Sequence, residues 1–358
     1  MRVSHPVVHP LQSSQGAAPD IWLDGVRHPY ASSLAALESE SAIQLESPET
    51  LAESLRARLG NHFRVPASSI HFLDSLDGAL IEIAMRAKGP IVGFPPSTSA
   101  SLLDSIALSQ PITWIVRGSG RKESIDVESA IDFPANSIAI IESPSDPLGS
   151  ILASADIVRL ARACRVVVVD ERHAQGADSS VLPLTSEFDN IVVLRSLESW
   201  AGIVDPPCAW CIGSPRTLAS LGVEEVSLTP AAAAAGIATL ANLDSVYLAL
   251  RMIRDERSRL YRLLRKFAFI EPIPSWGPFM AARVTLGPRE ALISGLAHRG
   301  VHIHAPLQPG LERIVRIGIA SRTPMERLKW ALIDLAPELV QLTLTERRSP
   351  PEPHHAEP

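Results

Sequence analysis

Side chains that could do acid–base chemistry fall in three short segments of the sequence. Glu142 and Asp146 lie in ESPSDPLG, Asp170 ends the apolar run VVVVD, and His173 follows three residues later. Carboxylates grouped in this way can bind a cation or act as a general base, and histidine can act as an acid or a base near neutral pH. With Ser199 they also supply the members of a Ser/His/Asp triad, but no Gly-x-Ser-x-Gly turn frames the serine.

Each of these residues also has a simpler interpretation. We favour the view that the three acids and His173 are polar residues of solvated loops. For Asp170 in particular, the alternative is a strand-end residue that caps the following turn.

Two further patterns have the spacing of metal or redox sites. His302 and His304 are two residues apart on an expected strand, so they share one face, as two metal ligands could. No third ligand lies near them in the sequence, and we expect no metal site. Cys208 and Cys211 form a C-x-x-C pattern that runs into an expected strand, where residues three apart face opposite sides. We therefore expect neither zinc binding nor redox chemistry from this pair.

These residues are carried by alternating helical and strand patterns. Five short segments are β-branched and almost wholly apolar, which is typical of parallel strands that are covered on both faces. Helical patterns separate several of them, so the order predicts an α/β fold with a doubly wound sheet. The expected strands are residues 91–94, 112–116, 137–143, 165–171 and 190–197, and the expected helices are 48–59, 75–87, 97–108 and 150–164.

The sequence changes character after Thr229. One long helix rich in Ala, Leu and Arg is expected over 231–264, and a smaller α+β unit follows, with helices near 290–299 and over 325–335. We divide the chain into a flexible arm (1–20), a large α/β domain (21–228) whose first segment contributes to the small domain, a long helix with the small C-terminal domain (229–345), and a disordered tail (346–358).

Composition and charge exclude several classes of protein. The 358 residues are 46% hydrophobic, which is enough for a large core and about two domains. The sequence contains no run of 18 apolar residues and no apolar leader. We therefore expect neither a membrane span nor secretion. The net charge of −6 argues against general nucleic-acid binding, and three cysteines fit a reducing compartment. Only four of the 33 basic residues are lysines, namely Lys88, Lys122, Lys266 and Lys329.

Five segments, in this order, resemble the fold-type I pyridoxal-phosphate enzymes. The resemblance is greatest to the histidinol-phosphate aminotransferase and threonine-phosphate decarboxylase branch of the class I/II aminotransferases, and it covers about residues 20–340. It implies a large domain with a mostly parallel sheet, a smaller C-terminal α+β domain, pyridoxal phosphate as cofactor, and a homodimer on which the N-terminal arm packs. The segments are APDIWLDGVRHPY (18–30), SPSDPLG (143–149), VVVVDE (166–171), VVLRSLESWAGI (192–203) and VRIGIASRTPMERL (315–328).

The resemblance implies a role for each position that matches the family's pattern. Asp170 falls on the aspartate that pairs with the pyridine nitrogen, and Arg316 falls on the arginine that grips the substrate carboxylate. Asp77 is retained in the first phosphate loop, and Ser196 falls on a cofactor-binding position. Asp146 falls on the asparagine that donates to the ring hydroxyl, where a carboxylate would repel a phenolate oxygen.

Other positions depart from that pattern. Ser199 stands where the resemblance places the Schiff-base lysine, and no lysine occurs between Lys122 and Lys266. Pro207 takes the place of the phosphate-binding arginine, and the stacking tyrosine falls near Thr98. Without the lysine, the covalent anchor and the proton carrier of this chemistry are missing.

The sequence therefore predicts an aminotransferase-like protein that is not a working transaminase and acts as a small-ligand-binding, scaffolding or regulatory homologue, with Arg316 as the site for a small carboxylate. One alternative is a pyridoxal-phosphate-dependent aminotransferase or decarboxylase of the histidinol-phosphate type with an unusual anchor. Another is a cofactor-independent enzyme that uses Asp146, Asp170, His173 or Glu198. We expect a cytoplasmic homodimer, or a heterodimer with an active homologue, and neither nucleic-acid nor membrane partners.

Overall fold

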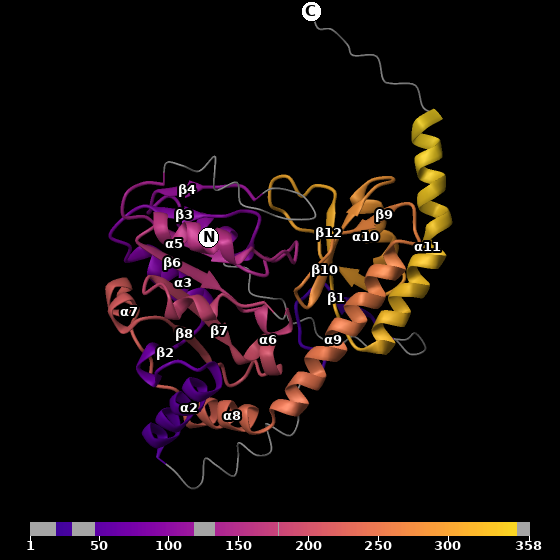
Figure 1. Cartoon of the computed structure of the whole chain (residues 1–358). Coiled ribbons are helices and arrows are strands. Elements are labelled where there is room, and N and C mark those ends of the chain that lie inside the picture. The colour runs from indigo at the N-terminus through magenta and orange to yellow at the C-terminus, as the bar shows by residue number, and fades with distance from the viewer. Residues whose placement is uncertain (1–18, 31–46, 118–132, 178, 349–358) are drawn as a thin grey trace, which may run out of the picture.

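The computed structural model describes residues 19–30, 47–117, 133–177 and 179–348, which form two lobes side by side (Figure 1). The larger lobe holds a seven-stranded sheet, and the smaller lobe holds a three-stranded and a two-stranded sheet. Most of the expected N-terminal arm and the last ten residues of the expected tail lie outside the described residues. The predicted α/β class with a second, smaller α+β unit is confirmed.

The seven-stranded sheet has the order β2-β8-β7-β6-β5-β3-β4. β8 is antiparallel to both of its neighbours, and the other pairings are parallel, so the sheet is mostly parallel as predicted. The five strands expected from the apolar runs are β3 to β7. The strands are β2 (Ile70–Leu73), β3 (Ile91–Gly93), β4 (Ile112–Trp114), β5 (Ile138–Glu142), β6 (Val166–Asp170), β7 (Ile191–Ser196) and β8 (Ala209–Ile212).

The central strands are apolar throughout because both of their faces are covered. In β6, Val167 and Val169 enter one hydrophobic core, and Val166 and Val168 enter another on the opposite face. The alternation follows from the two-residue period of a strand. Burying each such side chain contributes about 1.5–3 kcal/mol, so the two cores fix the sheet firmly and its polar ends can be used for other purposes.

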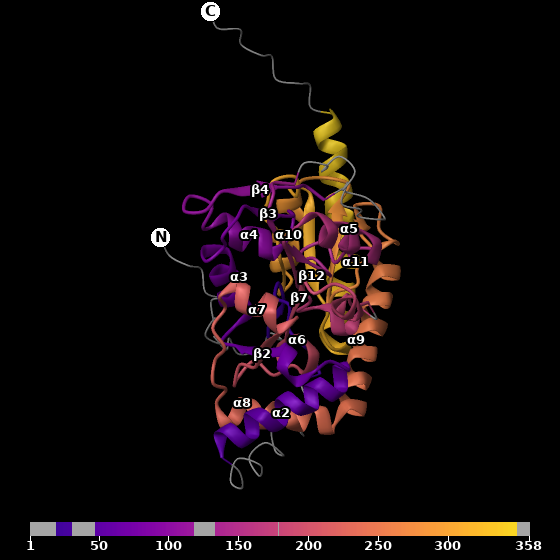
Figure 2. The same cartoon turned by 60° about the vertical axis from the view of Figure 1, so that its left-hand side comes forward.

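Helices cover both faces of this sheet. α3, α4 and α7 supply apolar side chains to the core on one face, and α2, α5, α6, α8 and α9 supply the core on the other. Figure 2 shows α2 lying along α8 below the sheet. The helices are α2 (Pro48–Phe63), α3 (Leu76–Met85), α4 (Thr98–Asp104), α5 (Ser154–Ala163), α6 (Leu197–Ala201), α7 (Pro215–Leu221), α8 (Pro230–Ala241) and α9 (Leu243–Leu264), with short 3-10 turns at Ala67–Ser69, Ala174–Gly176 and Leu182–Ser186.

Several of these helices begin at a serine or threonine cap. The side chains of Ser75 and Ser97 accept backbone N–H groups at the starts of α3 and α4, and Ser47, Ser214 and Thr229 do the same just before a proline. A capping oxygen satisfies an N–H that has no partner in the first turn, and proline at the first position needs none. The caps of α3 and α4 set the positions at which these helices meet the edge of the sheet.

The smaller lobe is built from the C-terminal segments and one N-terminal strand. β9 (Ile270–Pro272), β10 (Phe279–Val284) and β12 (Ile314–Gly318) form an antiparallel sheet of order β12-β10-β9. β1 (Ile21–Leu23) pairs in parallel with β11 (Val301–Ile303), so the N-terminal segment contributes to this lobe as expected. α10 (Arg289–Ala297) and α11 (Arg322–Arg348) pack against these strands.

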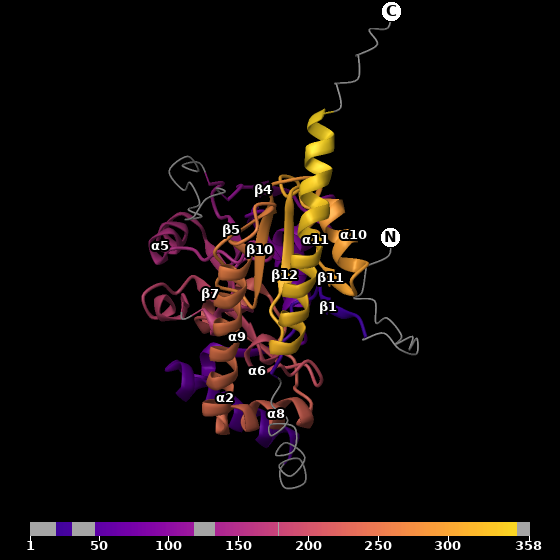
Figure 3. The ribbon, with the colours of Figure 1, turned by 90° about the vertical axis from the view of Figure 1, so that its right-hand side faces the viewer.

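The expectation of one helix over 231–264 is wrong, because α8 and α9 meet at an angle of 81°. Asn242 separates them with a non-helical backbone, and its side-chain amide donates to the carbonyl of Ala238. Asparagine competes in this way with the helical hydrogen bonds, and the bend directs α9 towards the smaller lobe (Figure 3). Among the described residues no single helix is long and apolar enough to cross a membrane, and only the bent pair of α8 and α9 reaches that length and composition together.

The final helix is longer than the sequence suggested. It begins at Arg322 rather than 325 and continues past Pro337 to Arg348 instead of ending at 335. Leu335 and Leu339, on either side of the proline, are buried in the core. Their burial offsets the roughly 3 kcal/mol that proline costs in a helix interior.

Candidate functional site

A cavity of about 420 Å³ opens where the parallel strands of the large sheet end. Ligands bind at this edge in open α/β sheets, and the volume is in the range of small-molecule sites. Its walls come from the turn after β1, the start of α3, the loops after β5 and β6, the segment from β7 to β8, and β12. The lining residues include Arg27, His28, Asp74, Asp77, Thr98, Asp146, Arg172, His173, Ser196, Glu198, Ser199, Pro207 and Arg316.

Seven of the catalytic and binding candidates that the sequence singled out line this cavity, and Glu142 and Asp170 do not. Asp170 is fully buried and lies behind Arg172, whose side chain lines the cavity instead. The candidates that line it are Asp77, Asp146, His173, Ser196, Glu198, Ser199 and Arg316. The fold thus brings together side chains that are up to 239 positions apart, from Asp77 to Arg316.

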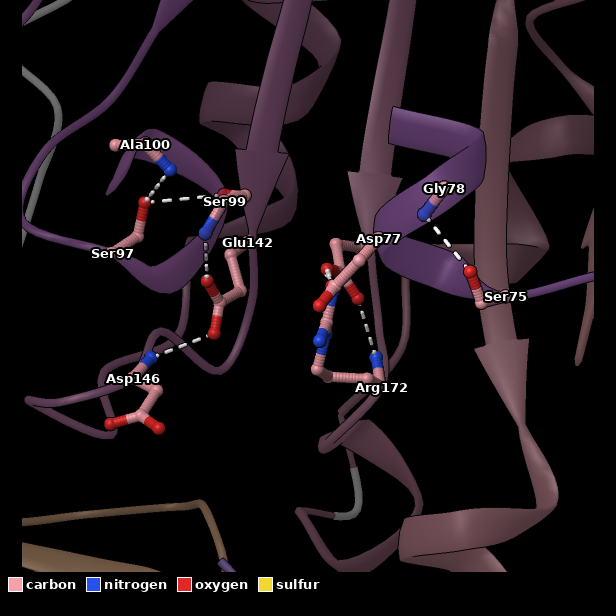
Figure 4. A network of polar contacts seen from close by, with 10 residues as sticks. Ser75, Asp77, Gly78, Ser97, Ser99, Ala100, Glu142, Asp146 and Arg172 are labelled. Carbon is pink, nitrogen blue, oxygen red and sulfur yellow. Dashed lines mark hydrogen bonds and ion pairs between the residues drawn. The ribbon is translucent and has the colours of Figure 1, made fainter. Parts of the chain in front are cut away.

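Arg172 forms the floor of the cavity, and sequence analysis missed it. Its Nε donates to Oδ2 of Asp170 at 2.8 Å, and its backbone N–H donates to Oδ1 of the same carboxylate at 3.0 Å. Its Nη2 donates to Asp77 at 2.6 Å (Figure 4). Asp170 caps the turn that follows its strand, as the simpler interpretation expected. It also holds the Arg172 guanidinium at the cavity, so it has a role there as well.

The side chain of Arg316 is held at the cavity wall by contacts with three residues. Its Nε lies 3.2 Å from Oδ1 of Asp146, its Nη2 donates to the carbonyl of Asp24 at 2.8 Å, and its guanidinium lies over the ring of Phe279. The side chain is only 7% exposed. Nε and Nη1 have no hydrogen-bond partner among the described residues, since the contact with Asp146 is close but poorly directed. A buried donor without a partner costs about 1–3 kcal/mol, which a ligand oxygen would recover.

The expectation that the three acids are solvated is wrong. Glu142 and Asp170 are fully buried on neighbouring strands, and Asp146 is largely covered. Burial, with the charge of Asp170, raises the pKa of Glu142 to about 8, although the backbone N–H of Ser99 partly opposes this. Glu142 accepts the N–H groups of Ser99 and Asp146 at 3.0 and 2.8 Å (Figure 4). These bonds tie the loop after β5 to the start of α4.

His173 is also buried rather than exposed in a loop. Its ring packs edge-on against Phe279, and its Nδ1 has no hydrogen-bond partner in the described structure. Burial and the charges of Arg172 and Arg316 lower the pKa of His173 well below its usual value, so the ring is neutral at pH 7. The Oγ of Ser199 has no hydrogen-bond partner either, and none of the observed hydrogen bonds joins Ser199, His173 and Asp170 as a triad.

No lysine of the described residues lines the cavity. Lys88 follows α3, and Lys266 and Lys329 lie in a separate hollow between α9 and α11. Lys122 lies outside the described residues. α6 presents Ser199 to the cavity, and the N-cap residue of this helix is Ser196.

The two patterns with metal-like spacing serve packing. His302 stacks on Trp22 and contacts Asp20, while burial lowers the pKa of His304 to about 4. No three His, Cys, Asp or Glu residues of the described chain are grouped as a metal site. Cys208 and Cys211 lie in cores on opposite faces of the sheet, as predicted, and burial raises the pKa of each to about 12.

The architecture defines the chain as a fold-type I aminotransferase-like protein. The chain belongs to the family "Aminotransferase class I and II", whose sequence profile matches residues 79–331. A histidinol-phosphate aminotransferase of Roseiflexus castenholzii is 26% identical over 317 residues, which are 84% of this chain and 85% of the relative.

Solved structures agree with this assignment of the fold. The histidinol-phosphate aminotransferase of Clostridium acetobutylicum superposes with a TM-score of 0.78 at 16% identity, over 89% of this chain and all of that one. The enzyme of Sinorhizobium meliloti, solved in complex with pyridoxal-5'-phosphate, superposes with a TM-score of 0.75 at 18% identity, over 89% of this chain and 91% of that one. The family is one of pyridoxal-phosphate enzymes.

The residues of this cavity do not fit that cofactor as they are arranged. Asp170, which the resemblance places opposite a ring nitrogen, is already bonded to Arg172. Asp146 presents a carboxylate where a ring hydroxyl would need a donor, and this carboxylate faces Arg316. Pro207 provides no charge for a phosphate, and Asp74, Asp77 and Glu198 line the cavity with negative charge. Arg172 and Arg316, whose charges could hold the cofactor, are paired with carboxylates of the cavity instead.

The sequence carried one local signal for Arg172, namely its spacing from Asp170. A basic residue two positions after a strand-end aspartate can fold back onto it, and the aspartate then caps the turn with its other oxygen. The turn residues Arg27 and His28, which also line the cavity, gave no comparable signal. They reach it because β1 pairs with β11, a contact between the two ends of the chain.

Proposed function

We propose that this protein binds a small carboxylate-bearing molecule in the cavity through Arg316 and does not carry out lysine-linked cofactor chemistry. The observation that supports the proposal is the state of Arg316, which is buried at the cavity wall with Nε and Nη1 free of hydrogen bonds. A guanidinium offers a carboxylate two parallel donors, and charge-assisted bonds of this kind are about twice as strong as neutral ones.

The serine at position 199 supports the second half of the proposal. Its hydroxyl lies at the cavity without a hydrogen-bond partner, and a hydroxyl cannot form the imine that an amine forms. The neutral His173 beside it can accept or donate one hydrogen bond to a ligand through Nδ1. Together with Arg316, these groups can bind and orient a ligand of one negative charge.

The binding test uses the purified full-length protein and isothermal titration calorimetry. L-amino acids and 2-oxo acids are compared with their primary amides, which have the same shape and no carboxylate. We expect the acids alone to bind, and we expect Arg316→Lys to weaken them about tenfold because lysine lacks the planar pair of donors. Arg313→Lys is the matched control, since Arg313 lies three residues before Arg316 and bonds the backbone outside the cavity. Equal binding of acid and amide would refute the proposal.

A second candidate function is amino-group transfer or decarboxylation with pyridoxal phosphate bound through an unusual anchor. The names of the relatives favour it, because the relatives with similar sequences are histidinol-phosphate aminotransferases. Lys122 is the lysine whose place the structure does not describe. The purified protein is incubated with pyridoxal phosphate, reduced with borohydride and digested. A pyridoxyl group on a lysine peptide would establish this candidate over the first, and its site would identify the anchor.

We further infer a homodimer in the cytoplasm, with a heterodimer with an active homologue as the alternative. Family resemblance supports the dimer, and three buried free cysteines suit a reducing compartment. Light scattering on the purified protein distinguishes a dimer from a monomer. A monomer that binds its ligand normally would contradict the inference.

A further inference from the structure

The guanidinium of Arg172 is bonded to a carboxylate at each of its two ends. Asp170 is fully buried at the end of β6, and both of its oxygens accept from Arg172, one from the side chain and one from the backbone. The far end of the guanidinium is fixed by Asp77 at the start of α3. The side chain therefore spans the cavity floor from β6 to α3 (Figure 4) and is only 17% exposed.

We propose that Arg172 occupies on Asp170 the place of a cofactor's protonated ring nitrogen, and so keeps pyridoxal phosphate out of this cavity. A pyridinium would present one charged N–H to the aspartate, and Nε of Arg172 presents the same group at 2.8 Å. The two donors cannot occupy the same oxygen with the same geometry. The inference concerns the cavity of the proposed function and rests on that assignment.

The internal cation has two advantages over a ring from solution. It is part of the chain, so its pairing with Asp170 costs none of the translational and rotational freedom that a ligand loses on binding. It also meets a second carboxylate, Asp77, which a ring nitrogen would not reach at the same time. A ring that displaced the guanidinium would have to break both contacts and leave a buried cation without its partners.

The charges around Arg172 also favour its guanidinium over a bound cofactor. Asp170, Asp77 and Glu142 each raise the pKa of the guanidinium, so it stays charged and paired. Asp74 and Glu198 also line the cavity, and they would repel the phosphate of the cofactor. Removal of Arg172 therefore frees the ring site on Asp170 while leaving an unfavourable phosphate site.

The test compares five full-length proteins, namely wild type, Arg172→Ala, Arg172→Lys, Ser199→Lys and the double variant Arg172→Ala/Ser199→Lys. Pyridoxine 5'-phosphate, which has the ring and phosphate but no aldehyde, is titrated while the fluorescence of the tryptophans is followed; Trp200 is next to Ser199. We expect Arg172→Ala to bind it at least about tenfold more tightly than wild type. Arg172→Lys is the conservative control, and it should bind as weakly as wild type because it keeps a cation beside Asp170.

The lysine variants supply a second, covalent readout. Each protein is incubated with pyridoxal phosphate and reduced with borohydride, and the peptide that contains residue 199 is weighed. We expect the pyridoxyl group at position 199 in the double variant and not in Ser199→Lys, because Arg172 still blocks the ring in the single variant. Labelling of Ser199→Lys at that position would overturn the proposal, and this outcome does not depend on the folding of any protein that carries Arg172→Ala.

The failure of this inference can be told apart from the failure of the proposed function. Arg172→Ala keeps Arg316, so its carboxylate binding reports on the proposed function while its pyridoxine phosphate binding reports on Arg172. A folded Arg172→Ala protein, as judged by circular dichroism, that binds pyridoxine phosphate no better than wild type would overturn the role of Arg172 alone. Loss of the difference between acids and amides in wild type would overturn the proposed function alone.

Discussion

Two arginine–carboxylate clusters lie at the same edge of the large sheet, and they begin at adjacent residues. Asp170 turns towards the cavity and meets Arg172, while Glu171 turns away and meets Arg195. In the Glu171 cluster every group is satisfied, since the carboxylate accepts Ser180, the backbone of Val181, and Nε and Nη2 of Arg195.

The second cluster, which we call the cavity cluster, comprises Asp77, Asp146, Asp170, Arg172 and Arg316. It differs because several polar groups in it and beside it have no hydrogen-bond partner. Nε and Nη1 of Arg316, Nδ1 of His173 and Oγ of Ser199 have no hydrogen-bond partner in the described structure. Buried polar groups are satisfied in most proteins, so leftover groups gathered around one cavity indicate a binding site. The comparison teaches that a buried ion pair alone does not mark a site, whereas a pair with unused donors beside a cavity does.

The largest effect is expected when the satisfied cluster is broken. Arg195→Met leaves Glu171 buried and unpaired, and we expect a loss of about 3–5 kcal/mol in the free energy of unfolding. Chemical denaturation measures it. The double variant Glu171→Met/Arg195→Met should recover most of the loss, since it removes both charges. A loss below that of an ordinary surface substitution would show that the pair is not structural.

A smaller and reversible effect is expected in the cavity cluster. Asp146→Asn removes the counter-ion of Arg316 and should cost about 1–3 kcal/mol. A carboxylate ligand at a hundred times its dissociation constant should return about 2.7 kcal/mol of stability. Thermal unfolding with and without ligand measures both quantities. The same ligand should return no more to Arg195→Met than it gives to wild type, and a larger gain there would erase the distinction between the clusters.

The pH dependence of stability should report on Glu142, the buried acid next to Asp170 and Asp146. The pKa of Glu142 is raised from 4.5 to about 8, so the folded protein holds a proton there that the unfolded chain releases. The contribution of Glu142 to stability is therefore full below pH 4.5 and is lost as the pH rises to 8. The buried histidines have lowered pKa values, so in the unfolded chain they release protons near pH 6.5 and oppose this trend there. Above about pH 7 they are mostly neutral in both states, and Glu142 dominates between pH 7 and 8.

Over that interval we expect wild type to lose about 1 kcal/mol, measured by denaturation at a series of pH values. Glu142→Gln is less stable overall, because an amide cannot accept from both backbone N–H groups, but its stability should not fall with pH in this range. An unchanged slope in the variant would assign the proton to another group.

The smallest effects compare the outer members of the clusters. Asp77 is 54% exposed, and Asp77→Ala should cost at most about 1 kcal/mol because its pair with Arg172 is screened by water. Ser180 is partly buried between Glu171 and Arg195, and Ser180→Ala should cost about 1–2 kcal/mol. If the exposed aspartate proved the more costly loss, the cavity cluster would have a structural role as well.

Much of the fold could be predicted because it depends on local composition. Five apolar runs became β3 to β7, and C-x-x-C was correctly placed across a strand with its cysteines on opposite faces. The bend at Asn242 and the continuation of α11 past Pro337 could not be predicted. Both depend on what packs against the helix, and tertiary burial outweighs the preference of a single residue.

The sequence singled out seven residues that the fold brings to one cavity, but it did not predict which of the polar groups are buried. It treated Glu142 and His173 as solvated and missed Arg172. Whether a charged side chain is exposed depends on the elements that cover it. For Glu142 these are the start of α4 and the loop after β5, which come from different parts of the chain.

The sequence by itself determined the alternation of strands and helices, the family, and the residue types available to the cavity, among them serine at 199. These follow from periodicity and chemistry that are written along the chain. Only the tertiary structure decided which charges meet. Asp170 pairs with Arg172, and Arg316 pairs with Asp146, because folding removes water from these groups and each buried charge must then find a partner within reach. The buried groups that still lack a hydrogen-bond partner, above all Nε and Nη1 of Arg316, remain available to a ligand.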